Sequence, residues 1–231
     1  MTYPATMTLP GQAAELSACD RTDLLRRMLV LRHLAVLRHS PSRGAEAVLA
    51  GIRAALSPSD TIRVVGGRPS PDQLTGTAAG VTVWLAHFGG NGGPDRICAL
   101  FAHQYRDRVQ RQLAVDGWDA EAVLAASAGA ARVVRTWGAA RLLTLRTAAR
   151  RGRRDPIAVL ATRMRLARQL DDGTFRALEL DARRIANRLS RDRGFDSGLA
   201  ALATAADELA PRFAPGVPEA AGEPPGQRPR R

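Results

Sequence analysis

The stretch Val115-Asp116-Gly117-Trp118-Asp119 sets the organisation of this 231-residue chain. Gly117 interrupts regular backbone, and Asp119 is a natural N-cap because its carboxylate can accept from the free N–H groups of a first helical turn. The apolar residues that follow recur at 3.6-residue spacing, so they predict a helix over residues 120–135. A glycine ends that helix, and the leucines after it predict a short buried strand over residues 142–145.

A basic loop at residues 147–154 separates this strand from another helix start. Asp155 is placed to cap the new helix. Pro156 takes its first position, where the missing proline N–H costs no hydrogen bond. Apolar periodicity then predicts three helices between Asp155 and residue 210.

The N-terminal half is predicted to hold two helices and a strand. The helices cover residues 20–38 and 45–56, and the strand covers residues 61–65. Residues 81–86 fit either a buried strand or part of a helix, because periodicity does not distinguish the two for so short a run. Residues 94–115 are predicted to form a helix with its apolar side chains on one face.

The order of these features resembles the α subunit of thiamine-diphosphate-dependent 2-oxo acid dehydrogenases, the E1 components. The pattern V-D-G-x-D, helix, R-x-x-G, L-L-x-x-x-T, basic loop, D-P-I is similar to the C-terminal half of that subunit. The matching residues are Val115, Asp116, Gly117, Asp119, Arg135, Gly138, Leu142, Leu143, Thr147, Asp155, Pro156 and Ile157.

A second pattern is similar to the opening of the same subunit. It runs L-x-R-R-M-L-x-x-R, a short link, then S-x-G-x-E-A-x-x-x-G-x-x-A-A-L-x-P-x-D-x-I. A generic helical hairpin with proline turns is the alternative explanation of this second pattern. The matching residues are Leu24, Arg26, Arg27, Met28, Leu29, Arg32, Ser42, Gly44, Glu46, Ala47, Gly51, Ala54, Ala55, Leu56, Pro58, Asp60 and Ile62.

The resemblance implies a helix-rich α/β fold, a reduced version of the thiamine-diphosphate-binding type with a small parallel sheet flanked by helices. We expect a single E1-α-like domain over residues 12–210. An irregular arm at residues 1–11 precedes it, and a disordered proline-rich tail at residues 211–231 follows it.

The resemblance also implies where a cofactor would lie. In the family, a Tyr-Arg pair follows the first strand, and its arginine helps to hold cofactor phosphate. Here Gly66-Gly67-Arg68-Pro69 occupies that region. Arg68 can stand in because guanidinium binds phosphate bidentately. The alternative is an ordinary surface-loop arginine, since the tyrosine is missing.

Gly90-Asn91-Gly92 resembles the metal-binding turn of the family, in which a buried strand ends in G-D-G and the Asp ligates Mg²⁺. The resemblance implies cofactor contacts from Gly90 and Gly92 and a metal ligand at Asn91, where a neutral amide replaces the carboxylate that magnesium favours. A plain glycine-rich turn is the alternative. The downstream metal-ligating Asn and the loop histidine of the family have no counterpart in this chain.

Charge and composition bear on the possible partners. All 34 basic residues are Arg, and the net charge is +12. Such a composition is typical of a high-GC bacterium, and the alternative is a selective absence of lysine. Positive charge favours polyanions, but the arginines are spread along the chain and interleave with acidic residues at positions 171–193, which is typical of a solvated helix surface. Nucleic acid is therefore disfavoured as a partner.

Few side chains are candidates for catalysis. Histidine is the usual side chain for acid–base chemistry, but neither His87 nor His103 has a recognisable carboxylate or nucleophile partner in the sequence, so both are interpreted as structural or exposed. Cys19 and Cys98 lack metal-binding spacing and are interpreted as reduced core thiols. The sequence shows neither a signal-peptide pattern nor roughly 20 consecutive apolar residues. We therefore expect a cytoplasmic protein without a membrane span.

The function implied by the resemblance is that of a shortened, divergent E1-α-like subunit in the oxidative decarboxylation of 2-oxo acids. It implies thiamine diphosphate and Mg²⁺ as cofactors. It also implies an oligomer with an E1 β-like subunit or a full-length thiamine enzyme. With no complete catalytic set, the chain is expected to be inactive alone and is a candidate pseudoenzyme. The alternative is a basic helical module that binds nucleic acid or an acidic protein.

Overall fold

The computed structural model describes residues 16–37, 44–65, 80–88, 96–103, 111–147, 155–192 and 198–209. Six helices and five strands lie in this part of the chain. The helices are α1 (Ala18–Leu37), α2 (Ala45–Ala55), α3 (Ala120–Trp137), α4 (Pro156–Leu166), α5 (Asp172–Asp192) and α6 (Leu199–Glu208). The strands are β1 (Thr61–Val65), β2 (Thr82–Phe88), β3 (Arg96–Ala102), β4 (Arg111–Asp116) and β5 (Arg141–Arg146).

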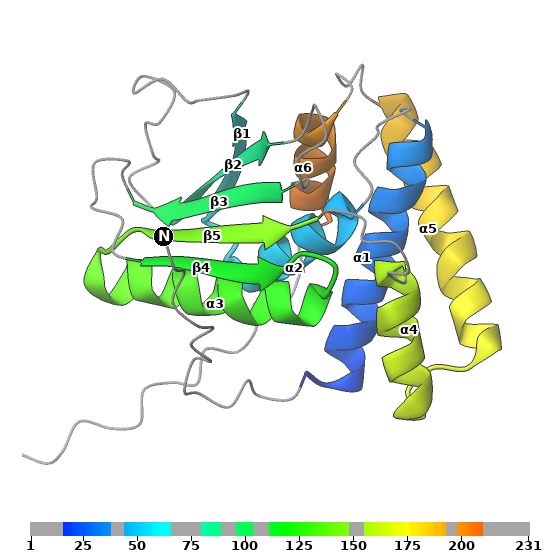
Figure 1. The fold of residues 1–231 in the computed structure, drawn as a ribbon. Coiled ribbons are helices and arrows are strands. Elements are labelled where there is room, and N and C mark those ends of the chain that lie inside the picture. The colour runs from blue at the N-terminus through cyan, green and yellow to red at the C-terminus, as the bar shows by residue number, and fades with distance from the viewer. Residues whose placement is uncertain are drawn as a thin grey trace, which may run out of the picture.

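The five strands form one mixed sheet in the order β1-β2-β3-β5-β4 (Figure 1). β1 pairs parallel with β2, and β4 pairs parallel with β5. β3 runs antiparallel to both of its neighbours. Four strands therefore point one way and β3 points the other. The predicted α/β class is confirmed, with a sheet that is mixed rather than wholly parallel.

The predicted helix over residues 94–115 is wrong, because β3 and β4 lie there instead. The apolar residues of this segment recur every four positions, as at Ile97 and Phe101. A spacing of four fits one face of a helix and also one face of a strand, whose period is two. Ala99, between them, is buried as well, which is the strand pattern. Residues 81–86, for which both structures fitted, lie largely in β2.

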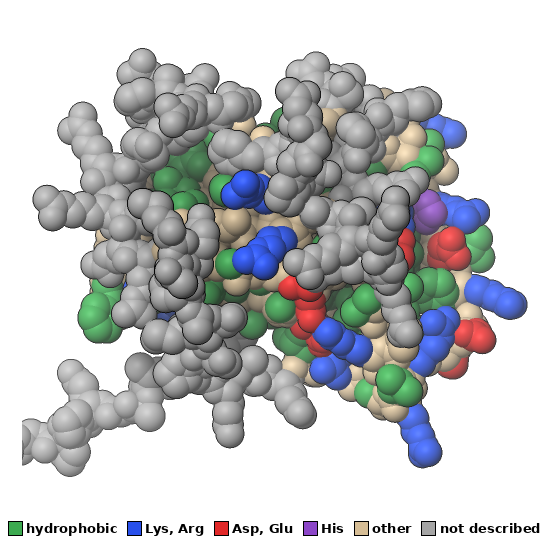
Figure 2. All heavy atoms as spheres, in the orientation of Figure 1, with side chains coloured by type: hydrophobic (Ala, Val, Ile, Leu, Met, Phe, Trp, Pro, Cys, Tyr) green, Lys and Arg blue, Asp and Glu red, His purple; other side chains and the backbone are tan. Residues whose placement is uncertain are grey.

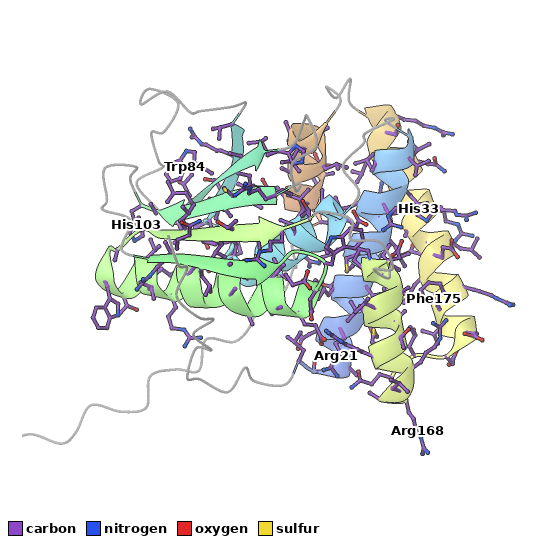
Figure 3. The ribbon with its side chains drawn as sticks, viewed as in Figure 1. Arg21, His33, Trp84, His103, Arg168 and Phe175 are labelled. Atoms are coloured by element: carbon purple, nitrogen blue, oxygen red, sulfur yellow. The ribbon has the colours of Figure 1, made fainter. Side chains whose placement is uncertain are left out.

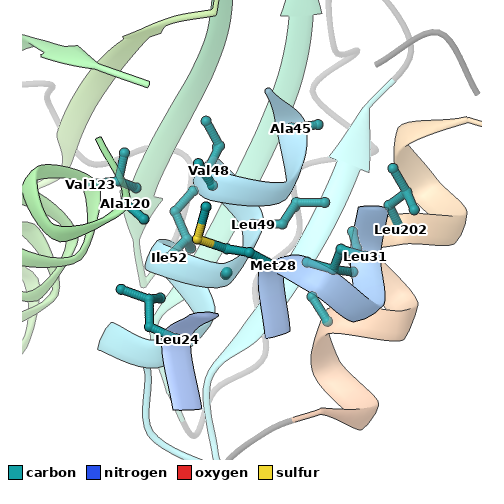
Figure 4. Packing of buried hydrophobic residues seen from close by; sticks show 14 of the residues in the cluster. Leu24, Met28, Leu31, Ala45, Val48, Leu49, Ile52, Ala120, Val123 and Leu202 are labelled. Atoms are coloured by element: carbon teal, nitrogen blue, oxygen red, sulfur yellow. The ribbon is translucent and has the colours of Figure 1, made fainter. Parts of the chain in front are cut away.

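Helices α2, α3 and α6 pack against one face of the sheet. Figure 4 shows α2 at the centre of this core, with Val48, Leu49 and Ile52 between side chains of α1, α3 and α6. The sheet contributes its inward-facing residues to the same core: Ile62, Val83, Leu85, Ile97, Ala99, Phe101, Val115, Leu143 and Leu145. The opposite face of the sheet carries a separate small cluster: Val65, Trp84, Ala86, Ala102 and Ala140.

The remaining helices form a group beside the sheet, in which α1 packs against α4 and α5 as well as α2 (Figure 1). Both predicted N-caps are confirmed. The Asp119 carboxylate accepts from the N–H groups of Glu121 and Ala122, and the Asp155 carboxylate accepts from Ile157 N–H at 2.8 Å. Both cysteines are free, and the expectation of a core position is wrong for Cys19, which is exposed on α1.

The predicted arm at residues 1–11 and tail at residues 211–231 lie outside the described residues. Within the described ranges, we find no helix that combines the length and apolar character needed to cross a bilayer.

Close packing of α2 on α3 requires a glycine at position 51. A Cβ atom on Gly51 would lie 2.8 Å from Val123 Cγ1 and 2.9 Å from the backbone oxygen of Ala120. Gly51→Ala is therefore expected to lower the free energy of unfolding by about 1–3 kcal/mol, because the two helices must separate. Gly129→Ala is the matched control, since a Cβ there meets no atom within 4 Å.

The control should raise stability by about 0.5–1 kcal/mol through the lower chain entropy of alanine in a helix. Urea unfolding of both variants measures the difference. Equal stability of the two variants would show that α2 and α3 are not in this close contact.

Candidate functional site at the carboxyl ends of β4 and β5

The predicted cofactor residues lie outside the described part of the chain. Arg68 falls within residues 66–79, and Gly90, Asn91 and Gly92 fall within residues 89–95. In the portion that is described, no group of three or more His, Cys, Asp or Glu side chains is arranged to hold a metal ion. The described site must therefore be built from other residues.

The carboxyl ends of the parallel strands β4 and β5 are the natural place to look, because ligands of open α/β sheets bind outside these ends. β4 ends at Asp116, and the next residue, Gly117, donates its N–H to Arg146 O at 3.0 Å. A Cβ atom on Gly117 would lie 2.9 Å from the same oxygen, so a side chain is excluded. Trp118 N–H donates to Asp116 Oδ1 at 3.1 Å. These bonds fix the turn that carries the Trp118 side chain.

Two buried hydrogen-bond donors at this edge have no hydrogen-bond partner among the described residues. Thr147 follows β5 and is 4% exposed, and neither its Oγ1 nor the Nε1 of Trp118 makes a hydrogen bond. Both side chains lie around Gly44, which has a φ of 89°. A Cβ atom on Gly44 would be 3.6 Å from Trp118 Cε2 and 3.8 Å from Thr147 Cβ. A hydroxyl and an indole N–H in this position suit an oxygen acceptor such as a carboxylate, phosphate or carbonyl.

Arg32 of α1 joins two segments near these donors, the one at Gly44 and the start of α4 at Asp155. Its Nε lies 3.0 Å from Glu46 Oε1, which its Nη2 also contacts, and its Nη1 lies 2.6 Å from Asp155 Oδ2. Glu46 is 3% exposed, and its other oxygen accepts from Gly44 N–H at 3.0 Å. Arg32 thereby holds Gly44 through Glu46, and the start of α4 through Asp155.

The ion pair between Arg32 and Asp155 favours the charged form of both groups. Burial by itself would lower the pKa of Arg32, but hydrogen bonds to Asp155 and Glu46 outweigh burial and raise that pKa. Burial would likewise raise the pKa of Asp155, yet its hydrogen bond and charge interaction with Arg32 lower it below its usual value.

A second arginine holds the start of α3 in the same way. Arg163 of α4 contacts both oxygens of Asp119 at 2.9 and 2.7 Å and Glu121 at 2.8 Å. Arg21 of α1 completes the group with a 2.7 Å ion pair to Glu121. Burial would raise the pKa of Asp119, but the Arg163 bonds and two backbone N–H groups lower it. Both helix N-caps are therefore part of arginine networks.

The histidines lie elsewhere in the fold. His103 follows β3, and its Nδ1 is 3.2 Å from Gly80 O (Figure 3). His87 is exposed on β2. His33 is on α1, where burial and then the charge of Arg183 lower its pKa.

A scan against protein-family models and a search of curated proteins both find no match to this chain. The residue patterns and the geometry of the site are therefore the basis for assigning a function.

Sequence analysis missed most of this site. Arg32 and Asp155 are 123 positions apart, and no local pattern links residues at such a distance. Trp118 lies inside the stretch that organises the chain, but nothing in the sequence shows that its indole N–H is buried without a partner. Thr147 was identified only through the family pattern.

A pair of threonine variants tests whether Thr147 is held for a ligand. Thr147→Val removes a buried hydroxyl that has no partner, so the isolated chain should keep its stability or gain up to about 1 kcal/mol. Thr144→Val is the control, because the Thr144 hydroxyl accepts from Gln112 Nε2 at 2.8 Å. That variant should lose about 1 kcal/mol in urea unfolding. A similar loss for Thr147→Val would show that its hydroxyl is already paired.

A pair of arginine variants tests the role of the Arg32 ion pairs with Glu46 and Asp155. Arg32→Ala leaves Glu46 buried without its counter-charge, so the free energy of unfolding should fall by about 3 kcal/mol. Arg26→Ala removes an ion pair from the same helix, but Arg26 and Asp181 are 44% and 42% exposed. Arg26→Ala is expected to lower the free energy of unfolding by about 0.5 kcal/mol. Chemical denaturation of both proteins measures the contrast, and equal losses would rule out a special role for Arg32.

Proposed function

We propose that this chain is a divergent E1-α-like subunit that supports a β-type thiamine enzyme partner instead of carrying out decarboxylation by itself. The proposal rests on the residues that carry the resemblance. They come from two separated parts of the sequence, and several of them are bonded to one another across that separation.

The clearest of these contacts joins Asp60 of the first pattern to Arg135 of the second. The Asp60 side chain is 1% exposed and forms an ion pair with the Arg135 guanidinium. The pairing of Arg32 with Asp155 likewise joins the first pattern to the second. If these contacts hold the scaffold together, they give a physical reason for the matching residues of the two patterns to occur in one chain. This set of cross-pattern contacts is the single observation that carries the proposal.

Among the described residues, no group of three or more His, Cys, Asp or Glu side chains is placed to hold a metal ion. Mg²⁺ requires oxygen ligands, at least one of them normally a carboxylate, arranged around the cofactor phosphates. No suitable cluster occurs among the residues whose positions are described, so we assign no chemical step to this chain. Its proposed contribution is a framework and two hydrogen-bond donors, Thr147 Oγ1 and Trp118 Nε1.

A partner subunit is also consistent with the exposed apolar side chains. Trp137 at the end of α3 is 78% exposed, and Leu166 at the end of α4 is 82% exposed. Tryptophan is enriched in protein interfaces relative to other surface. Burial of these side chains would be a direct benefit of assembly with a β-type subunit.

The test begins with co-expression of the tagged chain and any β-like or full-length thiamine enzyme encoded beside it. We expect the two to co-purify as a complex that binds thiamine diphosphate and Mg²⁺, whereas calorimetry with the isolated chain should show no specific binding. Decarboxylation of 2-oxo acids by the complex, with and without this chain, then measures whether the chain supports turnover.

Two results would contradict the proposal. A chain that never co-purifies with a thiamine enzyme has no such partner. Micromolar binding of the cofactor by the isolated chain would show that it holds thiamine diphosphate alone. In that case Asn91→Ala, compared with Thr147→Val, would identify which segment carries the site.

A further inference from the structure

Helix α5 has one packed side and one side that faces away from the protein. Its packed side chains face α1 and the core: Phe175, Leu178, Ala182, Ile185, Ala186 and Leu189. The outer side is rich in arginine. The sequence mixes these arginines with acidic residues, whereas the helix separates them in space.

Three acidic residues of α5 whose side chains are described, Asp172, Glu179 and Asp181, are already paired with arginines outside the set considered below. Asp181 forms a 2.7 Å ion pair with Arg26 of α1. Glu179 pairs with Arg183 at 3.1 Å, within α5. Asp172 pairs with Arg165 of α4 at 2.9 Å. These carboxylates therefore do not neutralise the remaining arginines of the helix.

Four exposed arginines are left, and we call them the basic arc: Arg176, Arg184, Arg188 and Arg191. Within the described part of the chain, none of the four forms an ion pair. At 100° and 1.5 Å per residue they occupy about 120° of the helix surface over about 22 Å. Figure 3 shows side chains of α5 extending away from α1, and Figure 2 shows basic and acidic side chains at this edge of the protein.

We propose that the basic arc binds the phosphate backbone of double-stranded DNA. Arginine forks hold phosphate oxygens bidentately, and neutralising phosphates releases condensed counterions, which drives binding. The inference is independent of the E1-α-like function, because it uses none of the residues of that site.

Other partners fit the arc less well. Single-stranded nucleic acid needs aromatic side chains on which bases stack, and Phe175, the one aromatic residue of α5, is on its packed side. A protein partner needs an apolar centre, and Leu180, 56% exposed, is the one large apolar side chain among these arginines. The major groove of B-DNA is about 12 Å wide and admits a helix, whereas that of A-form RNA is too narrow for side chains to enter.

The experiment is a fluorescence anisotropy titration of the full chain with a labelled 20-base-pair DNA duplex at several salt concentrations. We expect a dissociation constant on the order of 10⁻⁵ M at physiological salt, with no dependence on base sequence. The double variant Arg184→Ala/Arg188→Ala should bind at least tenfold more weakly. Its plot of log K against log salt should be less steep by about 1.8, since each lost phosphate contact removes about 0.9.

The matched control is Arg132→Ala/Arg146→Ala, which removes the same charge from exposed positions on α3 and β5. Because both variants lower the net charge equally, a general charge effect would weaken both to the same degree. That result, or no binding of DNA by the unmodified chain at physiological salt, would overturn the proposal. So would arc-dependent binding to vesicles containing phosphatidylserine without binding to DNA.

Discussion

The buried carboxylate of Asp60 fixes the junction on which the sheet is built. One of its oxygens accepts from Val81 N–H at 2.8 Å, and the other accepts from Ser57 N–H at 2.7 Å and from Arg135. These bonds join the end of α2, the start of β2 and the last turn of α3. The backbone at Gly80 must pass so close that a Cβ atom there would lie 2.3 Å from Ser59 O. A carboxylate on one side and a glycine on the other therefore fix where β1 and β2 begin their parallel pairing.

Local chemistry allowed much of the fold to be predicted. Asp119 and Asp155 were identified as helix N-caps because each is a side-chain acceptor that directly precedes an amphipathic run. For Asp155, the proline at the next position supports the same assignment, since proline is common at the first position of a helix. The strands after Pro94 were not predicted, because apolar residues four apart satisfy both helical and strand periods. Partners far apart in sequence were also hidden. Arg135 and Asp60 are 75 positions apart, so their ion pair follows only from the tertiary fold.

The arginines of this chain divide into two groups by their surroundings, although composition alone treats them alike. Arg32, Arg135 and Arg163 bind carboxylates at helix ends and turns, so their charge is part of the framework. For the arginines of the basic arc on α5, the described residues provide no such carboxylate partner. Arg53 is an intermediate case, because it lies 3.2 Å from Asp207 without an aligned hydrogen bond. Burial lowers the pKa of Arg53 and raises that of Asp207. The net charge of +12 therefore overstates the number of arginines that could bind a partner. It also does not show which part of the surface carries them.

Strand direction explains why the candidate site lies at one edge of the sheet. Phe88, Arg96, Arg146 and Asp116 are register partners across β2, β3, β5 and β4. Because β3 is reversed, the carboxyl ends of β2, β4 and β5 share this edge with the amino end of β3. The turn at Gly117, the Thr147 hydroxyl and, in sequence, Gly90-Asn91-Gly92 all follow strands that end there. The Trp118 indole N–H and the Thr147 hydroxyl, which have no hydrogen-bond partner among the described residues, thus lie at the edge where β4 and β5 end. The parallel pairing of β4 with β5 is what brings these two donors to one edge, because each donor follows the carboxyl end of one of these strands.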